Sequence, residues 1–530
     1  MLLKNGWIVD GTGQATYTGS IYVEKDQIVS IFRGEVPQGE YGEVLDCTGK
    51  WITPGFIDAH SHSDFFVTKP DSLFYFEPFL KQGVTTMIAG NCGFSTAGYR
   101  QKTIHQDEIG GGLFTNDGLD HSDFASWATK VDGHMPVNML SLIGHGTIRI
   151  GINGKDASPL SEEQLQEMEK TLENALDQGA AGISFGLMYE PGQFAPYEEL
   201  KRVAMIAKNK GKIATFHARA YSKVSTSYNP PVGGRAHNLR AIDEVVKLAK
   251  ETGVKTELSH LIFVGENSWS TVDESLSILE ETKNQGIDIG FDTYPMEFGA
   301  SVITVILPTW YLSLPAKKRK GWWTQLRLAF EIFLARKALG FGFEDILIAN
   351  TFGKHPEWEG KRVSDLSKEW KQSNLKTYLQ LVDETEGKIN VLMYRYQNPE
   401  IIERLRQHPQ SLYMSDAWME KEASVQNYAC YYAFTKFLVL ARDHQTSIEQ
   451  AIHKMTGATA TRFGIEKRGV LQEGAFADLN VLDLNTLSYL ENQGVSPKGM
   501  EYTINNGVIL VKKGVLQKKA AQSAGRLIRM

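Results

Sequence analysis

Six side chains of kinds that bind metals lie in short polar segments, each of which follows an apolar stretch of the chain. They are His60, His62, Cys92, His217, His260 and Asp416. Imidazole, thiolate and carboxylate groups together suit zinc better than magnesium or calcium, which prefer oxygen ligands. One histidine after a strand is usually a hydrogen-bonded structural residue, but six ligand-type residues at corresponding places favour a metal site.

The spacing of the first two histidines adds to this interpretation. His60 and His62 are two residues apart, directly after the apolar run 56–59. Because side chains alternate across an extended strand, a spacing of two directs both imidazoles to the same side. Together with the later histidines and Asp416, this pair predicts a zinc site.

The apolar runs that precede these residues alternate with amphipathic helical stretches. The runs cover 56–59, 84–89, 137–143, 181–185, 212–216, 255–258, 287–291 and 412–414. Residues 162–179 have the pattern of a helix between two of them. Repeated strand–helix units with apolar strands predict a parallel sheet covered by helices. Eight strands favour an α/β fold of the (β/α)8 TIM-barrel type, whose catalytic groups lie at the carboxyl ends of the strands.

The two ends of the chain differ from the middle. Residues 1–55 and 464–530 contain short strand-like runs bounded by Gly and Asn, and neither end has enough strands for a core of its own. We therefore expect both ends to build one small β-sandwich, with the barrel at 56–463. Residues 296–400 are too long for a single crossover, which predicts an inserted subdomain or lid.

Composition excludes several other classes of protein. The chain has 530 residues, 42% of them hydrophobic, and a formal charge of −6 without a basic stripe, so nucleic acid is not an expected partner. Three cysteines form no disulfide framework, and we expect neither a secretory signal nor a bilayer-spanning segment. We expect a cytoplasmic protein without a membrane span, and the oligomeric state stays open. The cluster Lys317–Lys320, beside Trp322 and Trp323, is interpreted as a solvated surface.

Several motifs resemble the N-acyl-D-amino-acid deacylase (D-aminoacylase) family of the amidohydrolase superfamily. The superfamily pattern is Pro54-Gly55-Phe56-Ile57-Asp58-Ala59-His60-Ser61-His62 with a late Ser415-Asp416. The narrower resemblance is carried by Gly90-Asn91-Cys92-Gly93-Phe94-Ser95, Gly144-His145-Gly146, Gly182-Ile183-Ser184-Phe185-Gly186-Leu187-Met188-Tyr189 and Asp292-Thr293-Tyr294-Pro295. It runs essentially from end to end and weakens across 310–345 and 417–436.

The resemblance implies a zinc-bearing barrel beside a small β-sandwich. It implies a tight zinc site of Cys92, His217 and His260. It also implies a second, weaker site of His60, His62 and Asp416, with Cys92 able to bridge the two metals. Many relatives bridge two metals with a carbamylated lysine on the fourth strand, and the run 182–188 contains no lysine. The Cys92 thiolate can supply that negative bridge. The alternative for Cys92 is a small buried hydrophobic residue.

The same groups imply a mechanism of amide hydrolysis. Zinc makes hydroxide available at neutral pH, and Asp416 would take up the water's proton and deliver it to the leaving nitrogen. Tyr189 and Tyr294 lie in the matching segments and are candidates for substrate binding. His145 and Arg219 could orient the small-molecule N-acyl amide substrate or could be scaffolding.

The residues expected to bind the substrate's carboxylate differ from the family's. A family lysine is replaced by Ile262, a serine of the Tyr294 segment is lost, and Ala429 stands where an arginine belongs. Aromatic residues are numerous instead: Phe263, Phe298, Trp418, Tyr428, Tyr431 and Tyr432. Because a buried carboxylate without a cation is costly, we expect a larger and less anionic acyl amide. Recruitment of another cation, such as Arg395, would preserve the ordinary substrate.

Two other functions are compatible with the pattern. One is cyclic-amide opening of the hydantoinase or dihydroorotase type, which shares the barrel and the His-x-His pair. The absent fourth-strand lysine and the presence of Cys92 argue against it. The other is a non-catalytic binding protein on the same scaffold, which would not need to keep Asp416 and every candidate ligand.

Overall fold

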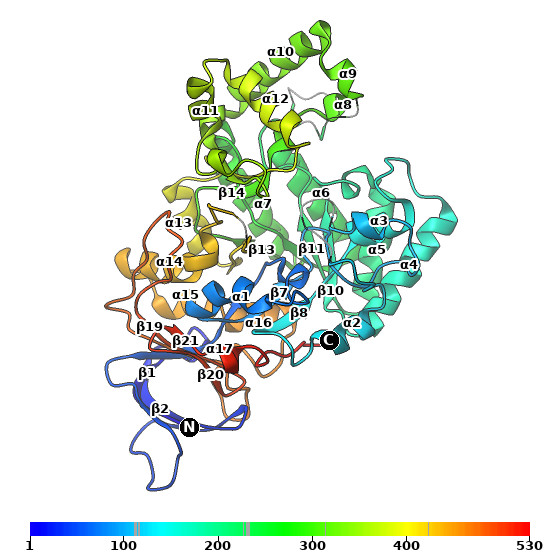
Figure 1. The fold of residues 1–530 in the computed structure, drawn as a ribbon. Coiled ribbons are helices and arrows are strands. Elements are labelled where there is room, and N and C mark those ends of the chain that lie inside the picture. The colour runs from blue at the N-terminus through cyan, green and yellow to red at the C-terminus, as the bar shows by residue number, and fades with distance from the viewer. Residues whose placement is uncertain (111–113, 115–116, 226, 229–233, 313, 422) are drawn as a thin grey trace.

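Strands from both ends of the chain are hydrogen-bonded into one sheet at the base of the molecule (Figure 1). The computed structural model describes residues 1–530 except 111–113, 115–116, 226, 229–233, 313 and 422. The nine strands of this sheet are β1 (Leu2–Ile8), β2 (Tyr17–Glu24), β3 (Gln27–Phe32), β4 (Val44–Asp46), β5 (Trp51–Pro54), β18 (Leu479–Leu482), β19 (Met500–Asn505), β20 (Val508–Lys512) and β21 (Val515–Leu516). The two ends meet where β5 pairs antiparallel with β18, with Ile52 opposite Val481.

The sequence between these ends forms the barrel. Its parallel strands are β6 (Phe56–Asp58), β7 (Val84–Ala89), β8 (Asn138–Ser141) with β9 (Ile143–Gly144), β10 (Gly182–Gly186), β11 (Ile213–His217), β12 (Lys255–Leu258), β13 (Ile289–Thr293) and β17 (Ser411–Tyr413). Two backbone hydrogen bonds join the two parallel sheets into a ring: Ala59 donates to Tyr413 (3.4 Å), and Ala181 donates to Ser141 (2.9 Å). Every apolar run expected to be a strand contains or overlaps one of these strands, and the predicted barrel is confirmed.

Helices cover the outside of the barrel (Figure 1). They are α1 (Ser72–Lys81), α2 (Phe124–Val131), α3 (His145–Asn153), α4 (Glu162–Asp177), α5 (Tyr197–Asn209), α6 (His237–Thr252), α7 (Val272–Asn284), α13 (Pro399–Gln407), α14 (Ala429–Asp443), α15 (Ile448–Lys454) and α16 (Gly457–Phe463), with α17 (Lys518–Ala521) on the terminal sheet. The local sequence explains α4 well. Ser161 and Gln164 form a capping box, and Met168, Leu172 and Leu176 recur at helical spacing on its buried face.

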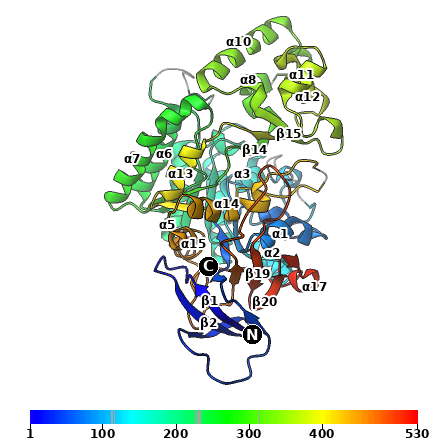
Figure 2. The same ribbon diagram turned by 90° about the vertical axis from the view of Figure 1, so that its left-hand side faces the viewer.

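A separate group of elements leaves the barrel after β13 and returns through α13 to β17. Its antiparallel sheet has the order β14 (Gly299–Val302), β16 (Asn390–Met393), β15 (Ile346–Asn350). Its helices are α8 (Thr309–Leu312), α9 (Ala316–Arg319), α10 (Trp322–Leu339), α11 (Val363–Glu369) and α12 (Asn374–Glu384). Figures 1 and 2 show this insertion at the end of the molecule opposite the terminal sheet. In the described part of the chain no helix is long and apolar enough to cross a membrane.

Candidate metal centre

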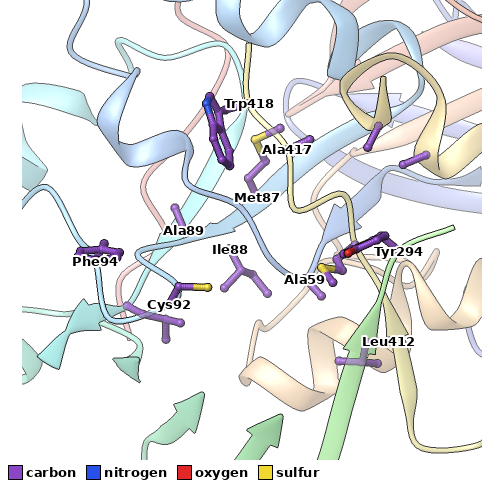
Figure 3. Close-up of a cluster of buried hydrophobic side chains, with 14 of the residues drawn as sticks. Ala59, Met87, Ile88, Ala89, Cys92, Phe94, Tyr294, Leu412, Ala417 and Trp418 are labelled. Carbon is purple, nitrogen blue, oxygen red and sulfur yellow. The ribbon is translucent and has the colours of Figure 1, made fainter. Parts of the chain in front are cut away.

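The six candidate ligands come together at the carboxyl end of the barrel. They lie on or just after strands β6, β7, β11, β12 and β17. Ligand atoms of these histidines and of Cys92 form two groups, and within each group the atoms all lie within 4.8 Å of one another. One group is His60, His62 and Cys92, and the other is Cys92, His217 and His260. Cys92 belongs to both groups, so its sulfur could serve either of two metal positions or bridge them. Figure 3 shows Cys92 beside Phe94 and Ile88, with its sulfur directed toward the side on which Ala59 lies.

Distances place Cys92 between the groups and Asp416 beside one of them. The Cys92 sulfur is 3.3 Å from His60 Nε2 and 3.4 Å from His260 Nε2. Asp416 Oδ1 is 3.6 Å from His60 Nε2 and 3.7 Å from His62 Nε2. The rings of His217 and His260 are 4.4 Å apart. Each of these six side chains, a carboxylate, a thiol and four imidazoles, therefore lies close to at least one other.

The burial, missing hydrogen-bond partners and lowered pKa values of these histidines suit ligands of a zinc ion. His217 is 4% exposed, and neither of its ring nitrogens has a hydrogen-bond partner among the described residues. A buried polar group without a partner is costly, and a metal ion would satisfy it. Burial lowers the pKa of His60 to about 3 and that of His260 to about 4. Both imidazoles are thus neutral at neutral pH, which is the form that binds metals.

The thiol and the carboxylate respond to burial in different ways. Burial raises the pKa of the Cys92 thiol well above its ordinary value. A metal at this position would therefore have to displace a proton from the sulfur. Burial alone would also raise the pKa of Asp416, but the neighbouring imidazoles of His62, His260 and His60 hold it below its ordinary value. Asp416 is thus ionised at neutral pH and can accept a proton.

The backbone at three of these residues is in the left-handed region. Cys92 has φ 52°, His260 has φ 32° and Asp416 has φ 47°. Residues other than glycine adopt such values infrequently, and the surrounding structure must impose them. Gly186 on β10 allows the Cys92 loop to approach, because a Cβ at Gly186 would lie 2.0 Å from the Cys92 carbonyl oxygen.

Two buried carboxylates, Asp58 and Asp292, have no role in the predicted site, yet they hold together the segments that carry the candidate ligands. Asp58 accepts hydrogen bonds from the backbone N–H groups of Ser415 (3.0 Å) and His60 (3.2 Å). Asp292 Oδ2 lies 3.4 Å from His60 Nδ1, and Asp292 also accepts from the backbone N–H of His260. Their position could have indicated this role from the sequence, because they lie at the ends of β6 and β13, where functional groups of a barrel are found.

Replacing Asp292 with asparagine tests this supporting role. We expect Asp292→Asn to weaken zinc binding by about 10- to 100-fold, because a carboxylate beside a ligating imidazole fixes its orientation and raises its basicity. Competition with a chromophoric chelator measures the affinity. Asp288→Asn is the matched control, because Asp288 lies just before β13 and pairs with Arg462 instead. Equal zinc affinities in the two variants would contradict the role of Asp292.

The four candidates for substrate binding are not equally placed. Tyr189 and Tyr294 lie near the donor groups. The Tyr189 ring is 4.5 Å from the ring of His217. Tyr294 is buried, and burial together with the charge of Asp416 raises its pKa. His145 and Arg219 are instead held by acidic partners. His145 Nε2 is 2.8 Å from Glu199 Oε1, which also accepts from Arg149, and Arg219 Nε donates to Glu244 at 3.0 Å. These contacts with Glu199 and Glu244 favour scaffolding for both residues.

Comparisons with known proteins agree with this architecture. The model of the amidohydrolase family matches residues 43–317 and 412–511. An N-acyl-D-glutamate deacylase and a D-aminoacylase, both of Alcaligenes xylosoxydans xylosoxydans, are 25% and 26% identical to the whole chain and are covered over 96% and 97% of their lengths. A crystal structure of N-acyl-D-glutamate deacylase from Bordetella bronchiseptica, complexed with zinc and a phosphonate inhibitor, has a TM-score of 0.79 at 24% identity, with 100% of this chain and 99% of that chain covered. The chain therefore belongs to the amidohydrolase family and is a metal-dependent hydrolase of carbon–nitrogen bonds other than peptide bonds.

Proposed function

We propose that this protein hydrolyses a linear N-acyl amide with the help of zinc. The observation that supports the proposal most strongly is the pair of donor groups that share Cys92, with Asp416 Oδ1 within 3.7 Å of two of the imidazoles. The names of the two relatives that span the whole chain, an N-acyl-D-glutamate deacylase and a D-aminoacylase, point to the same kind of bond.

The residues divide into holding and proton-transferring roles. Cys92, His217 and His260 would hold the tighter zinc, and His60, His62 and Asp416 a second one. A zinc ion held there supplies a Lewis acid for the amide carbonyl and lowers the pKa of water. Asp416 Oδ1, ionised in this environment, takes the proton of the attacking water and returns it to the leaving nitrogen.

Aromatic side chains beside the donor groups would exclude bulk water and contact the substrate. The ring of Phe114 stacks on His62 at 4.7 Å, and that of Trp418 meets His62 edge-on at 5.8 Å. Tyr432, another of the aromatic residues expected in the pocket, stacks on Tyr489 instead. A wall of this composition favours an apolar portion on the substrate.

Electrostatics near the donor groups favour a substrate without a carboxylate next to the amide. In the described part of the chain, no Lys or Arg is among the charges that act most strongly on Asp416 or Tyr294. Arg219 is held by Glu244, and Arg395 by Glu266 and Asp345. A carboxylate buried without a cation would be costly. We therefore propose that the amine portion is neutral, or less anionic than in N-acyl-D-amino acids.

A matched substrate panel with metal analysis tests both levels of the proposal. The panel holds N-acetyl and longer N-acyl D-amino acids, their L forms, the corresponding N-acyl amines and a hydantoin. We expect purified protein to contain zinc and to release amine faster from the carboxylate-free amides. Faster D-selective release from N-acyl-D-amino acids would contradict the neutral amine portion and leave linear-amide hydrolysis standing. Turnover of the hydantoin alone, or an inert protein after zinc addition, would contradict linear-amide hydrolysis.

A further inference from the structure

Helix α10 presents an apolar face to solvent. Six large apolar side chains on it are between 46% and 67% exposed: Trp322, Trp323, Leu326, Phe330, Phe333 and Leu334. These are six of the eighteen exposed large hydrophobic side chains in the described part of the chain. Residues 322, 326, 330 and 333 follow one another at intervals of three or four, so they share one side of the helix.

The opposite side of the same helix is also apolar and packs on the insertion. Leu328 and Ile332 are 0% and 5% exposed. A surface helix normally carries polar residues on its outer face. The exposed side of α10 instead carries six large apolar side chains beside only two exposed charged ones, Arg327 and Lys337. Contiguous exposed apolar patches of this kind mark interaction sites.

The aromatic residues at the start of the face are held in a defined arrangement. The rings of Trp322 and Trp323 stack at 3.7 Å, and the Lys337 ammonium lies 4.9 Å from the Phe333 ring. The turn before the helix is pinned by Arg319, which donates to the carbonyl oxygens of Leu314 (2.8 Å) and Leu312. The face and the turn before it are thus tied by contacts within the insertion.

The charge around this face identifies the partner. Residues 316–339 carry seven Lys or Arg side chains and one acidic side chain, in a chain whose formal charge is −6. The acidic one, Glu331, is paired with Arg327 at 2.8 Å and accepts from Trp310. Among the described residues, no acidic side chain pairs with Lys317, Lys318 or Lys320. A basic rim therefore flanks the apolar face, with Lys317–Lys320 before the helix and Lys337 near its end, while Arg336 pairs with Glu344 at 3.4 Å.

We propose that α10, together with Lys317–Lys320, docks this protein on the surface of an anionic phospholipid bilayer. Aromatic and aliphatic side chains of an interfacial helix enter the headgroup region, and Trp is favoured there. Adjacent lysines and arginines are attracted to anionic headgroups. A second copy of the chain fits less well, because a symmetric dimer through this face would bring the two basic rims together.

The location of α10 gives the docking a defined orientation. The insertion leaves the barrel at the carboxyl end of β13, which is the end that carries the donor groups. Figures 1 and 2 show α10 at the tip of the insertion and the terminal sheet at the opposite end of the molecule. Docking through α10 therefore turns the donor-group end of the barrel, and not the terminal sheet, toward the lipid.

Vesicle flotation of the full-length, zinc-loaded protein tests the proposal. One vesicle population is phosphatidylcholine alone, and the other is an equimolar mixture of phosphatidylcholine and phosphatidylglycerol. We expect the protein to float with the mixed vesicles at low salt, to float weakly with phosphatidylcholine, and to be released as salt rises. Absence of flotation with the mixed vesicles at low salt would overturn the proposal.

Three variants show whether this face is responsible. A protein with Trp322→Ser, Trp323→Ser and Phe330→Ser is expected to lose about tenfold or more in partition onto mixed vesicles. A protein with Lys317→Glu, Lys318→Glu and Lys320→Glu should lose the preference for anionic lipid. The matched control carries Ile104→Ser, Leu490→Ser and Val515→Ser, whose positions are 92%, 51% and 62% exposed elsewhere on the surface.

The controls also separate the membrane from other partners. The first two variants should match the unchanged protein in zinc content and thermal unfolding, because the replaced side chains are exposed. Equal flotation of the α10 variants and the control would overturn the proposal. So would sedimentation of the unchanged chain as a dimer that the triple-serine variant converts to a monomer, without binding to vesicles. That result would assign the face to a second copy of the chain.

Discussion

Asp416→Asn is expected to lower kcat by about 10²- to 10⁴-fold, the range that a positioned general acid–base residue contributes. Asparagine keeps the size of the side chain and can still lie against His60 and His62. It cannot take up a proton from water and return it to the leaving nitrogen. Because the pKa of Asp416 lies below its ordinary value, the wild-type carboxylate is ionised throughout the neutral range, and the variant should be impaired across that whole range.

Steady-state kinetics and zinc content must be measured on the same preparation of Asp416→Asn. Zinc held by Cys92, His217 and His260 should remain, since Asp416 belongs to neither of the two donor groups that share Cys92. Asp64→Asn serves as a control, because Asp64 is a buried carboxylate that accepts from the backbone N–H of Thr96 (2.8 Å). Activity of Asp416→Asn within about tenfold of wild type would refute the proton-transfer role.

Cys92→Ala is expected to have the largest effect on metal content. The Cys92 sulfur lies within 3.4 Å of ring nitrogens from both donor groups, so its removal takes a ligand from each. Loss of a group that merely supports a ligand costs about 10- to 100-fold in metal affinity, and loss of the ligand itself should cost more. We expect the purified variant to contain little zinc and to have no measurable hydrolase activity.

The chain contains its own controls for the removal of a buried cysteine. Cys47 and Cys430 are both 0% exposed, lie in hydrophobic clusters and belong to neither donor group. Cys47→Ala and Cys430→Ala should lower thermal stability slightly and leave zinc content unchanged. If Cys92→Ala behaves in the same way, Cys92 is a packing residue and the proposed bridge is wrong.

Much of the barrel could be predicted because its signals are local. Each strand is a short apolar run, and periodicity of that kind depends only on neighbouring residues. The helix expected at 162–179 is present as Glu162–Asp177, and its capping box can be recognised in the sequence alone. His60 and His62 were found for the same reason, because alternation along a strand determines which side chains point the same way.

Other features depend on contacts that no local pattern contains. Asp58 and Asp292 act on the ligand segments through hydrogen bonds to residues distant in the chain, such as Ser415 and His260. The sequence alone allows Arg219 to be named as a residue that could orient substrate, and Arg395 as a possible cation for a substrate carboxylate. The sequence could not show that Glu244, Glu266 and Asp345 already hold them. For Lys317–Lys320 the sequence predicts only a solvated surface, because it does not show which face of α10 packs inward.

The sequence by itself determined the kind of barrel, the six donor side chains and the family resemblance, since these depend on residue type and short spacing. The resemblance implied that Cys92 could bridge two sites, but only the tertiary structure placed its sulfur in both donor groups, 168 positions from His260 in the chain and 3.4 Å from His260 Nε2 in space. The tertiary structure also decided which charges are paired and which apolar face remains exposed. Those outcomes arise because closure of a barrel brings the ends of distant strands to one place, and burial there sets both the partners and the protonation of each group.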